Sequence, residues 1–345
     1  MSGGSRSDRG AAACAAAALA LVVLYTAVSL GVLPAIYIDC SSGFEVWDSM
    51  MRGTPFNILR YVDPADISRD AQAFFTYWTP GQYVLPGMVE RLGLGLGRAI
   101  VVVDGVFSLA GLVGWLIAYR TFGFSGRTAA ITVAIVACSR HLGVPFGYYN
   151  GGEVLMFGAT PWFLVLVWRL REFPWVAVPI LLIAASLLVF LKLTGVLVTG
   201  STLGAAVLMK DGIWPITAGT VRRGLVAGVT LLLFALVFYV AWFSRGATPG
   251  SMTSELHWEK LLPHTAFAAV AIWGASFSLG DLASYLLIHP ARPLFGSLEP
   301  LGYLMLPFAL ATFVFVWRTQ RQTHAEYLRF VFWMGLSFSA VLIAS

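Results

Sequence analysis

The chain has 345 residues, of which 58% are hydrophobic and only 11% are charged. Soluble domains carry about 25% charged residues, so this composition excludes an ordinary water-soluble enzyme and a disordered chain, and three cysteines exclude a disulfide scaffold. The mean hydropathy of +0.79 predicts membrane helices, since one crossing needs roughly 20 apolar residues. The net charge of +5 does not indicate nucleic acid, because the basic residues form short clusters between apolar runs.

The first predicted span lies near the N-terminus. Residues 10–38 carry no charge, which is longer than the apolar core of a signal peptide. We therefore expect an uncleaved transmembrane helix over 11–38. Arg6 and Arg9 precede this run, so the positive-inside rule places the N-terminus in the cytoplasm.

A polar segment over 39–98 follows and is predicted to be a large extracytoplasmic loop. It holds seven of the 17 acidic residues: Asp39, Glu45, Asp48, Asp63, Asp66, Asp70 and Glu90. Residues 43–52 read as a short helix with one apolar side, which would lie on the membrane surface. A second short helix is expected to begin at Asp63 or Asp66 and to lead into 71–75.

Eight further spans are predicted in the rest of the chain, over 99–244 and 300–345. We expect them over 99–119, 128–146, 154–168, 174–191, 193–209, 225–243, 300–317 and 330–345. Residues 245–299 are predicted to form a second extracytoplasmic loop. Its segment 261–280 lacks charge but would lie on, or re-enter, the outer face, because a crossing there would place the basic cluster at 318–329 outside.

The predicted fold class is therefore an all-α polytopic transmembrane bundle of about nine spans, forming one membrane domain. In this topology 12 basic and four acidic residues face the cytoplasm, against 10 and 13 elsewhere. That asymmetry agrees with the positive-inside rule. We expect a multi-pass protein of the cytoplasmic membrane.

The first outer loop holds the densest set of candidate functional residues. Asp39 stands at the end of the first span, where a carboxylate could deprotonate an acceptor hydroxyl or hold a divalent cation; a solvated loop acid is the alternative. Glu45 and Asp48 share one helix face, which is more typical of a solvated surface. Aromatic residues then surround a Pro-Gly turn, in an arrangement that suits sugar or polyprenyl binding but also an interfacial belt: Tyr77, Trp78, Gln82 and Tyr83.

Charges inside or at the rim of apolar windows form a second set, because such charges are costly in lipid and usually face a partner or a wet cavity. They are Asp104, Arg140 with His141, Glu153 and Lys192. Asp104 is more often a buried helix–helix hydrogen-bonding residue. Arg140 and Glu153 could pair across a short outer turn, or Glu153 could open a helix at the outer cavity. Lys192, at a hairpin tip, could snorkel to the interface or contact a phosphate.

This layout resembles the membrane glycosyltransferases of the GT-C fold class, over residues 1–210 in arrangement and 38–98 in motif. In that family a first span precedes a large outer loop with an acidic residue and short surface helices. The similar stretches here are Ile38–Phe44, Arg52–Phe56, the aromatic-proline segment Tyr77–Tyr83 and the lysine-bearing hairpin tip Leu191–Gly195.

The resemblance implies that a sugar passes from a polyprenyl-phosphate carrier to an acceptor at the extracytoplasmic face, with inversion. Asp39 would be the catalytic base or a metal-linked carboxylate, and Glu153 a second acidic residue of the cavity. The expected partners are a lipid-linked sugar donor and membrane lipid. A transporter or lipid flippase would instead use the intramembrane charges as a pathway, and a non-catalytic assembly subunit would need none of these residues.

Overall fold

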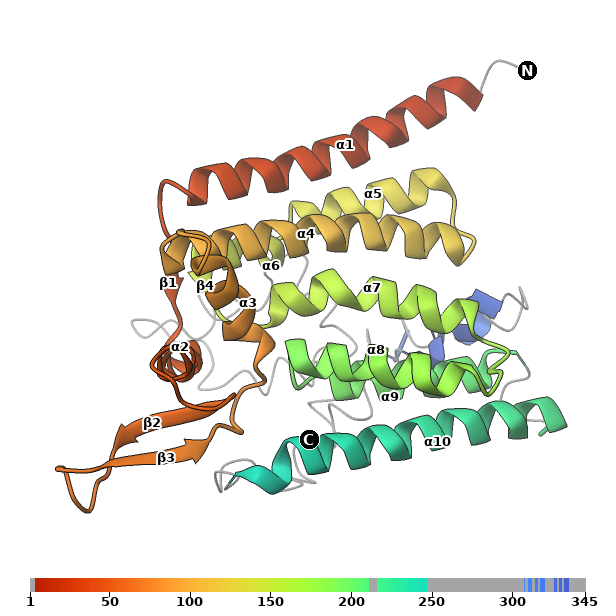
Figure 1. The fold of residues 1–345 in the computed structure, drawn as a ribbon. Coiled ribbons are helices and arrows are strands. Elements are labelled where there is room, and N and C mark those ends of the chain that lie inside the picture. The colour runs from red at the N-terminus through yellow and green to blue at the C-terminus, as the bar shows by residue number, and fades with distance from the viewer. Residues whose placement is uncertain are drawn as a thin grey trace.

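The computed structural model describes residues 4–210 and 216–246, with isolated positions between 307 and 334 (Figure 1). This part of the chain contains ten α-helices, two 3-10 helices and four short strands. The prediction of a mostly helical fold is therefore confirmed. The expectations for the loop over 247–299, including 261–280, and for the terminal run 335–345 lie outside the described residues.

Three helices have the length and hydropathy of membrane spans. They are α1 (Gly4–Ser29), α4 (Leu96–Thr121) and α10 (Ala218–Ala241). At 1.5 Å per residue, helices of 24 to 26 residues reach across a hydrocarbon core of about 30 Å. The chain is a membrane protein, as its composition predicts.

The expected number of about nine spans is wrong for the described residues, where only those three helices meet the criteria for a span. The other apolar helices have 12 to 17 residues. They are α5 (Gly126–Ala137), α7 (Glu153–Arg169), α8 (Ala177–Leu191) and α9 (Gly195–Leu208). The sequence predicts one span over 128–146 because hydropathy does not distinguish an apolar turn from a helix. In the structure this run is divided: α5 ends at Ala137, and α6 (Arg140–Gly143) and the 3-10 helix η1 (Val144–Phe146) follow.

The first helix also ends earlier than its apolar run. Helix α1 stops at Ser29, and β1 (Ala35–Ile36) pairs in parallel with β4 (Tyr148–Tyr149). Pro34 lies in this connection, and proline cannot donate a helical hydrogen bond. Helix α2 (Ile38–Met51) then begins at once, five residues before the predicted start at Gly43. Its apolar residues Phe44, Val46 and Trp47 are buried in a core with Tyr83 and Tyr149, so the expectation that this side lies on the membrane surface is wrong.

A β-hairpin replaces the second short helix that the sequence predicts. Strands β2 (Ile58–Val62) and β3 (Asp70–Phe74) pair antiparallel. The side chains of Asp63 and Asp66, predicted to start a helix, instead accept hydrogen bonds from the backbone N–H groups of Ala65 (2.9 Å) and Ser68 (3.1 Å). Such side chain-to-backbone bonds favour turns over helices, and the bonds from Ser68 lower the pKa of Asp66.

Asn57 joins this hairpin to the helices. It is fully buried, and its φ of 62° lies in the left-handed region that asparagine tolerates. Its side-chain nitrogen donates to the Phe75 carbonyl at 2.6 Å. Its side-chain oxygen accepts from the hydroxyl of Tyr83 on α3 (Gly81–Glu90). Burial raises the pKa of Tyr83, so the phenol stays protonated and able to donate.

Replacing Asn57 with Ala is therefore expected to destabilise the fold by about 1–3 kcal/mol, because the buried Tyr83 hydroxyl loses its acceptor. Thermal unfolding in detergent measures this effect. Ile67→Ala, at the exposed tip of the same hairpin (86% exposed), is the control and should leave the melting temperature unchanged. Equal effects of the two substitutions would show that Asn57 is not an anchor.

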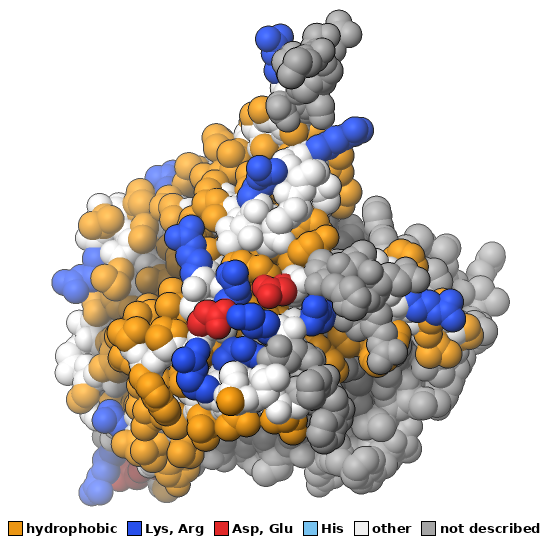
Figure 2. Space-filling model, turned by 90° about the vertical axis from the view of Figure 1, so that its right-hand side faces the viewer, with side chains coloured by type: hydrophobic (Ala, Val, Ile, Leu, Met, Phe, Trp, Pro, Cys, Tyr) orange, Lys and Arg blue, Asp and Glu red, His pale blue; other side chains and the backbone are white. Residues whose placement is uncertain are grey.

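The helices run side by side between two ends of the bundle (Figure 1). The loop end carries α2, the β-hairpin, α3 and the start of α7. The basic face, at the opposite end, is where α4, α7 and α9 finish and where α5 and α10 begin. Figure 2 shows this face, on which Lys and Arg side chains surround acidic groups.

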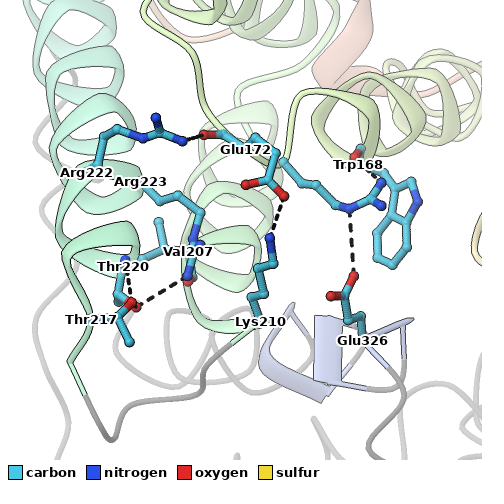
Figure 3. A network of polar contacts seen from close by, with 10 residues as sticks. Trp168, Glu172, Val207, Lys210, Thr217, Thr220, Arg222, Arg223 and Glu326 are labelled. Carbon is cyan, nitrogen blue, oxygen red and sulfur yellow. Dashed lines mark hydrogen bonds and ion pairs between the residues drawn. The ribbon is translucent and has the colours of Figure 1, made fainter.

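Ion pairs and backbone contacts hold the basic face together (Figure 3). Lys210 pairs with Glu172 at 2.7 Å, and Arg222 donates to the Glu172 carbonyl at 3.0 Å. The hydrogen bond from Lys210 lowers the pKa of Glu172. Arg171 contacts Glu326 at 3.7 Å. The clusters around 120–127, 169–172 and 210–223, which the sequence assigns to one side, thus lie at one end of the bundle.

This arrangement predicts that the basic face is cytoplasmic and the loop end extracytoplasmic. In a protein lacking its native cysteines, a cysteine at Thr194 should react with an impermeant maleimide added to intact cells. A cysteine at Trp175, exposed near the basic face (59%), should react only after permeabilisation. The opposite labelling pattern would invert the topology, and labelling of both sites in intact cells would overturn it.

Candidate active site

An ion pair at the loop end joins two charges that the sequence singles out. The Lys192 ammonium donates to Glu153 Oε1, and their side chains are 14% and 29% exposed. Glu153 is the first residue of α7, where the helix N-terminus also favours negative charge. Lys192 lies at the tip between α8 and α9, in extended backbone. Glu153 therefore pairs with Lys192, whereas the side chain of Arg140, its predicted partner, lies outside the described residues.

The other carboxylate oxygen of Glu153 is buried and has no hydrogen-bond partner among the described residues. A buried, unpaired acceptor is costly, and such atoms occur where a ligand or water completes the contact. This oxygen is thus available to accept a proton or hydrogen bond from a bound molecule.

Gln82 connects this ion pair to the first outer loop. Its Oε1 accepts a hydrogen bond from the Gly152 backbone N–H at 3.0 Å, and its Nε2 donates to Thr79 Oγ1 at 3.4 Å. Its backbone carbonyl accepts from the Tyr149 hydroxyl. Burial, and secondarily the charges of Asp104, Cys40 and Glu153, raise the pKa of Tyr149, so this phenol remains a donor. The start of α3 is fixed against the start of α7.

Close packing at two glycines makes this junction possible. Gly151 has a φ of 97°, and a Cβ atom there would overlap Gln82 Oε1 and lie 3.1 Å from Cys40 Sγ. A Cβ at Gly152 would lie 2.8 Å from the Leu191 carbonyl oxygen. The backbone of Gly151 and Gly152 is therefore packed closely between the starts of α2 and α3 and the end of α8.

The backbone of Asp39 lies near the Glu153–Lys192 pair. It lies in the first turn of α2, not at the end of the first span, and it precedes the buried Cys40. Since Cys40 Sγ approaches Gly151, the start of α2 is close to the backbone that positions Glu153. The side chains of Asp39 and Arg140 lie outside the described residues.

Several other predicted site residues lie apart from the ion pair or support the fold. Glu45 and Asp48 are exposed, and Asp48 pairs with Arg52 at 2.8 Å, as expected for a solvated face. Tyr83 anchors the hairpin through Asn57. His141 is exposed.

The aromatic pair Tyr77 and Trp78 forms part of the loop end. The two rings meet edge to face, with centroids 5.1 Å apart. Tyr77 is 37% exposed, whereas the indole nitrogen of Trp78 is buried without a hydrogen-bond partner among the described residues. The position of Trp78 suits either packing or a ligand hydroxyl, and no described contact joins it to Glu153.

Asp104 differs from its expected role. It is fully buried in α4, but neither carboxylate oxygen has a hydrogen-bond partner in the described part of the chain. The predicted helix–helix hydrogen bond is therefore not formed there.

An apolar groove that sequence reasoning missed lies beside the site. The first groove has a volume of about 310 Å³ and lies between the loop end, α8 and α10. Its lining includes Phe56, Phe74, Phe190 and Trp242, together with Thr79, the partner of Gln82. Arg245 is the charged residue among its described lining; its guanidinium lies 5.8 Å from the centre of the Phe74 ring and forms no ion pair with the described residues.

The groove depends on contacts between segments far apart in the sequence. The Trp242 indole donates to the Thr76 carbonyl at 3.2 Å, so the end of α10 is attached to the loop after β3. The Phe74 and Trp242 rings meet edge to face at 5.2 Å. No periodicity in the sequence indicates these pairings.

Known proteins provide no further assignment, because no family model, curated protein or solved structure matches this chain. The described residues also contain no cluster of three or more His, Cys, Asp or Glu side chains that could hold a metal ion. The chemistry of the site is therefore argued from its own residues.

Proposed function

We propose that this protein is a membrane glycosyltransferase that moves a sugar from a polyprenyl-phosphate carrier to an acceptor at the extracytoplasmic face. The observation that carries the proposal is the Glu153–Lys192 pair at the loop end, in which one carboxylate oxygen has no hydrogen-bond partner among the described residues. Gln82 holds the backbone N–H of Gly152, which directly precedes Glu153, and also bonds Thr79, which lines the first groove. Acid–base groups, an apolar groove and an arginine that forms no ion pair with the described residues suit a lipid-linked anionic donor.

The first groove would hold the beginning of the carrier chain. Its aromatic walls offer apolar contact, and α10, which forms one side, is a candidate span. Arg245 would bind the carrier phosphate, since guanidinium matches phosphate oxygens in a bidentate way. The sugar would then lie on the Thr79 side of the groove, toward Gln82 and Glu153.

The proposed reaction is a single displacement. Asp39 and Glu153 act as the pair of carboxylates that takes up the proton of an acceptor hydroxyl. The acceptor oxygen forms a bond to the anomeric carbon as the bond between that carbon and the phosphate oxygen breaks. The electron pair leaves with the polyprenyl phosphate, whose charge Arg245 offsets, and the configuration at the anomeric carbon is inverted.

The test of the Asp39 role is Asp39→Asn, assayed in membranes with a radiolabelled polyprenyl-phosphate sugar. Loss of a base is expected to lower the transfer rate by about 10²-fold or more. Asp48→Asn, on the exposed face of the same helix, is the matched control and should retain activity. Unchanged transfer by Asp39→Asn would eliminate Asp39 as the base, and no transfer by the wild type would favour a transporter or an assembly subunit.

A further inference from the structure

We infer that the acceptor is itself anchored in the membrane, and that its hydrocarbon chain occupies a second groove between α4, α7 and α8. This inference rests on the proposed function. The second groove has a volume of about 360 Å³, and all of its described lining residues are apolar. It lies on the other side of α8 from the first groove, which is lined by Ser186, Val189 and Phe190 of that helix.

The second groove faces the surroundings of the helices rather than the protein core. Val106, Trp162 and Leu187 line it and are 58%, 43% and 60% exposed. Because α4 is a candidate span, these surfaces would lie at the depth of the hydrocarbon core, where a chain can enter sideways from the bilayer. An amphiphile, and not a water-soluble glycan, has access to such a groove.

Small residues on all three helices create the hollow. Ala110 on α4, Gly158 and Ala159 on α7, and Ala184 on α8 line it. The only polar group among its described side chains, the indole N–H of Trp162, already donates to the Ala110 carbonyl at 3.2 Å. The groove therefore offers no free hydrogen-bond donor from a side chain, and its chemistry selects a hydrocarbon chain.

The second groove extends toward the Glu153–Lys192 pair. Leu191 lines the groove and directly precedes Lys192. On the facing wall, Gly158 lies five residues after Glu153 on α7, which corresponds to about 7.5 Å along a helix. A chain in this groove would thus carry its headgroup to the ion pair. The first groove reaches Phe190, so both grooves approach the tip of α8 from opposite sides.

The experiment uses the full-length protein in liposomes and hexadecyl glucoside with a diazirine in the middle of its chain as the probe. After irradiation, mass spectrometry is expected to find the probe on residues of the second groove. Unlabelled hexadecyl glucoside should compete, whereas glucose should not. Ala184→Phe, which fills the hollow, is expected to reduce this labelling several-fold. Leu232→Phe, on an exposed surface of α10 (69%), is the matched control and should not.

Ala159→Leu is a second variant that fills the groove, and it is used if Ala184→Phe does not fold. The labelling result counts only for a filling variant with the melting temperature of the wild type. Labelling spread evenly over exposed helix surfaces, or unaffected by the filling variants, would overturn the inference. The probe reports binding without turnover, so this failure is distinct from failure of the glycosyltransferase proposal. If transfer from the polyprenyl donor persists in both filling variants with lipid and soluble acceptors alike, the acceptor does not use the groove.

Discussion

Glu153→Gln is expected to lower the rate of sugar transfer by about 10²- to 10⁴-fold, the range for loss of a positioned acid–base group. Glutamine has the shape of glutamate but cannot take a proton at neutral pH. Its amide can still accept a hydrogen bond from Lys192, so the start of α7 should keep its place. The measurement is a single-turnover assay with the labelled donor in detergent or liposomes.

Two controls separate chemistry from structure in this prediction. Glu45→Gln changes an exposed carboxylate of α2 and should leave transfer unchanged. Binding of the unreacted donor should be retained in Glu153→Gln, because Arg245 and the first groove are untouched. Wild-type transfer by Glu153→Gln would remove Glu153 from the reaction, and lost donor binding would assign it to recognition instead.

Gly151→Ala is the second substitution with a large expected effect, on both stability and activity. A residue with a Cβ atom at a φ of 97° costs about 1–2 kcal/mol in backbone strain. The added methyl group would also overlap Gln82 Oε1 and press toward Cys40. Because Gln82 holds the Gly152 N–H, the methyl group would displace the backbone that leads into Glu153. Thermal unfolding and the transfer assay measure the two consequences.

Gly53→Ala is the matched control, since Gly53 has the same φ of 97° but no atom within 4 Å of the added Cβ. It carries the backbone strain without the clash. We expect Gly151→Ala to be the less stable of the two and to lose most transfer activity, while Gly53→Ala keeps it. Equal stability and full activity in both variants would mean that the junction at Gln82 tolerates displacement.

The features predicted correctly are those with a strong one-dimensional signal. Low charge and long apolar runs identify a membrane protein, and the basic clusters identify helix ends that lie at one face. The position of Lys192 at the tip between α8 and α9 could be predicted because this lysine separates two apolar runs in the sequence. Helix lengths were less predictable, since hydropathy does not distinguish α5 from the apolar turn and short helices that follow it.

The β-hairpin and the ion pair show why the rest could not be predicted. Strand pairing between 58–62 and 70–74 competes with helix formation, and the aspartate side chains that could cap a helix form turns instead. The partner of Glu153, Lys192, is 39 residues away in the sequence, so only the tertiary arrangement of α7 and α8 brings the two charges together. Both grooves likewise arise between helices and leave no local pattern.

The most direct test of the account is the fate of the donor with the purified wild-type protein. The protein is reconstituted in liposomes with a radiolabelled polyprenyl-phosphate sugar and a host membrane extract as the source of acceptors. We predict that the label leaves the carrier and appears in a product whose anomeric configuration, measured by NMR, is opposite to that of the donor. A donor that stays as intact as in protein-free liposomes, or a product that retains the configuration, would contradict the account.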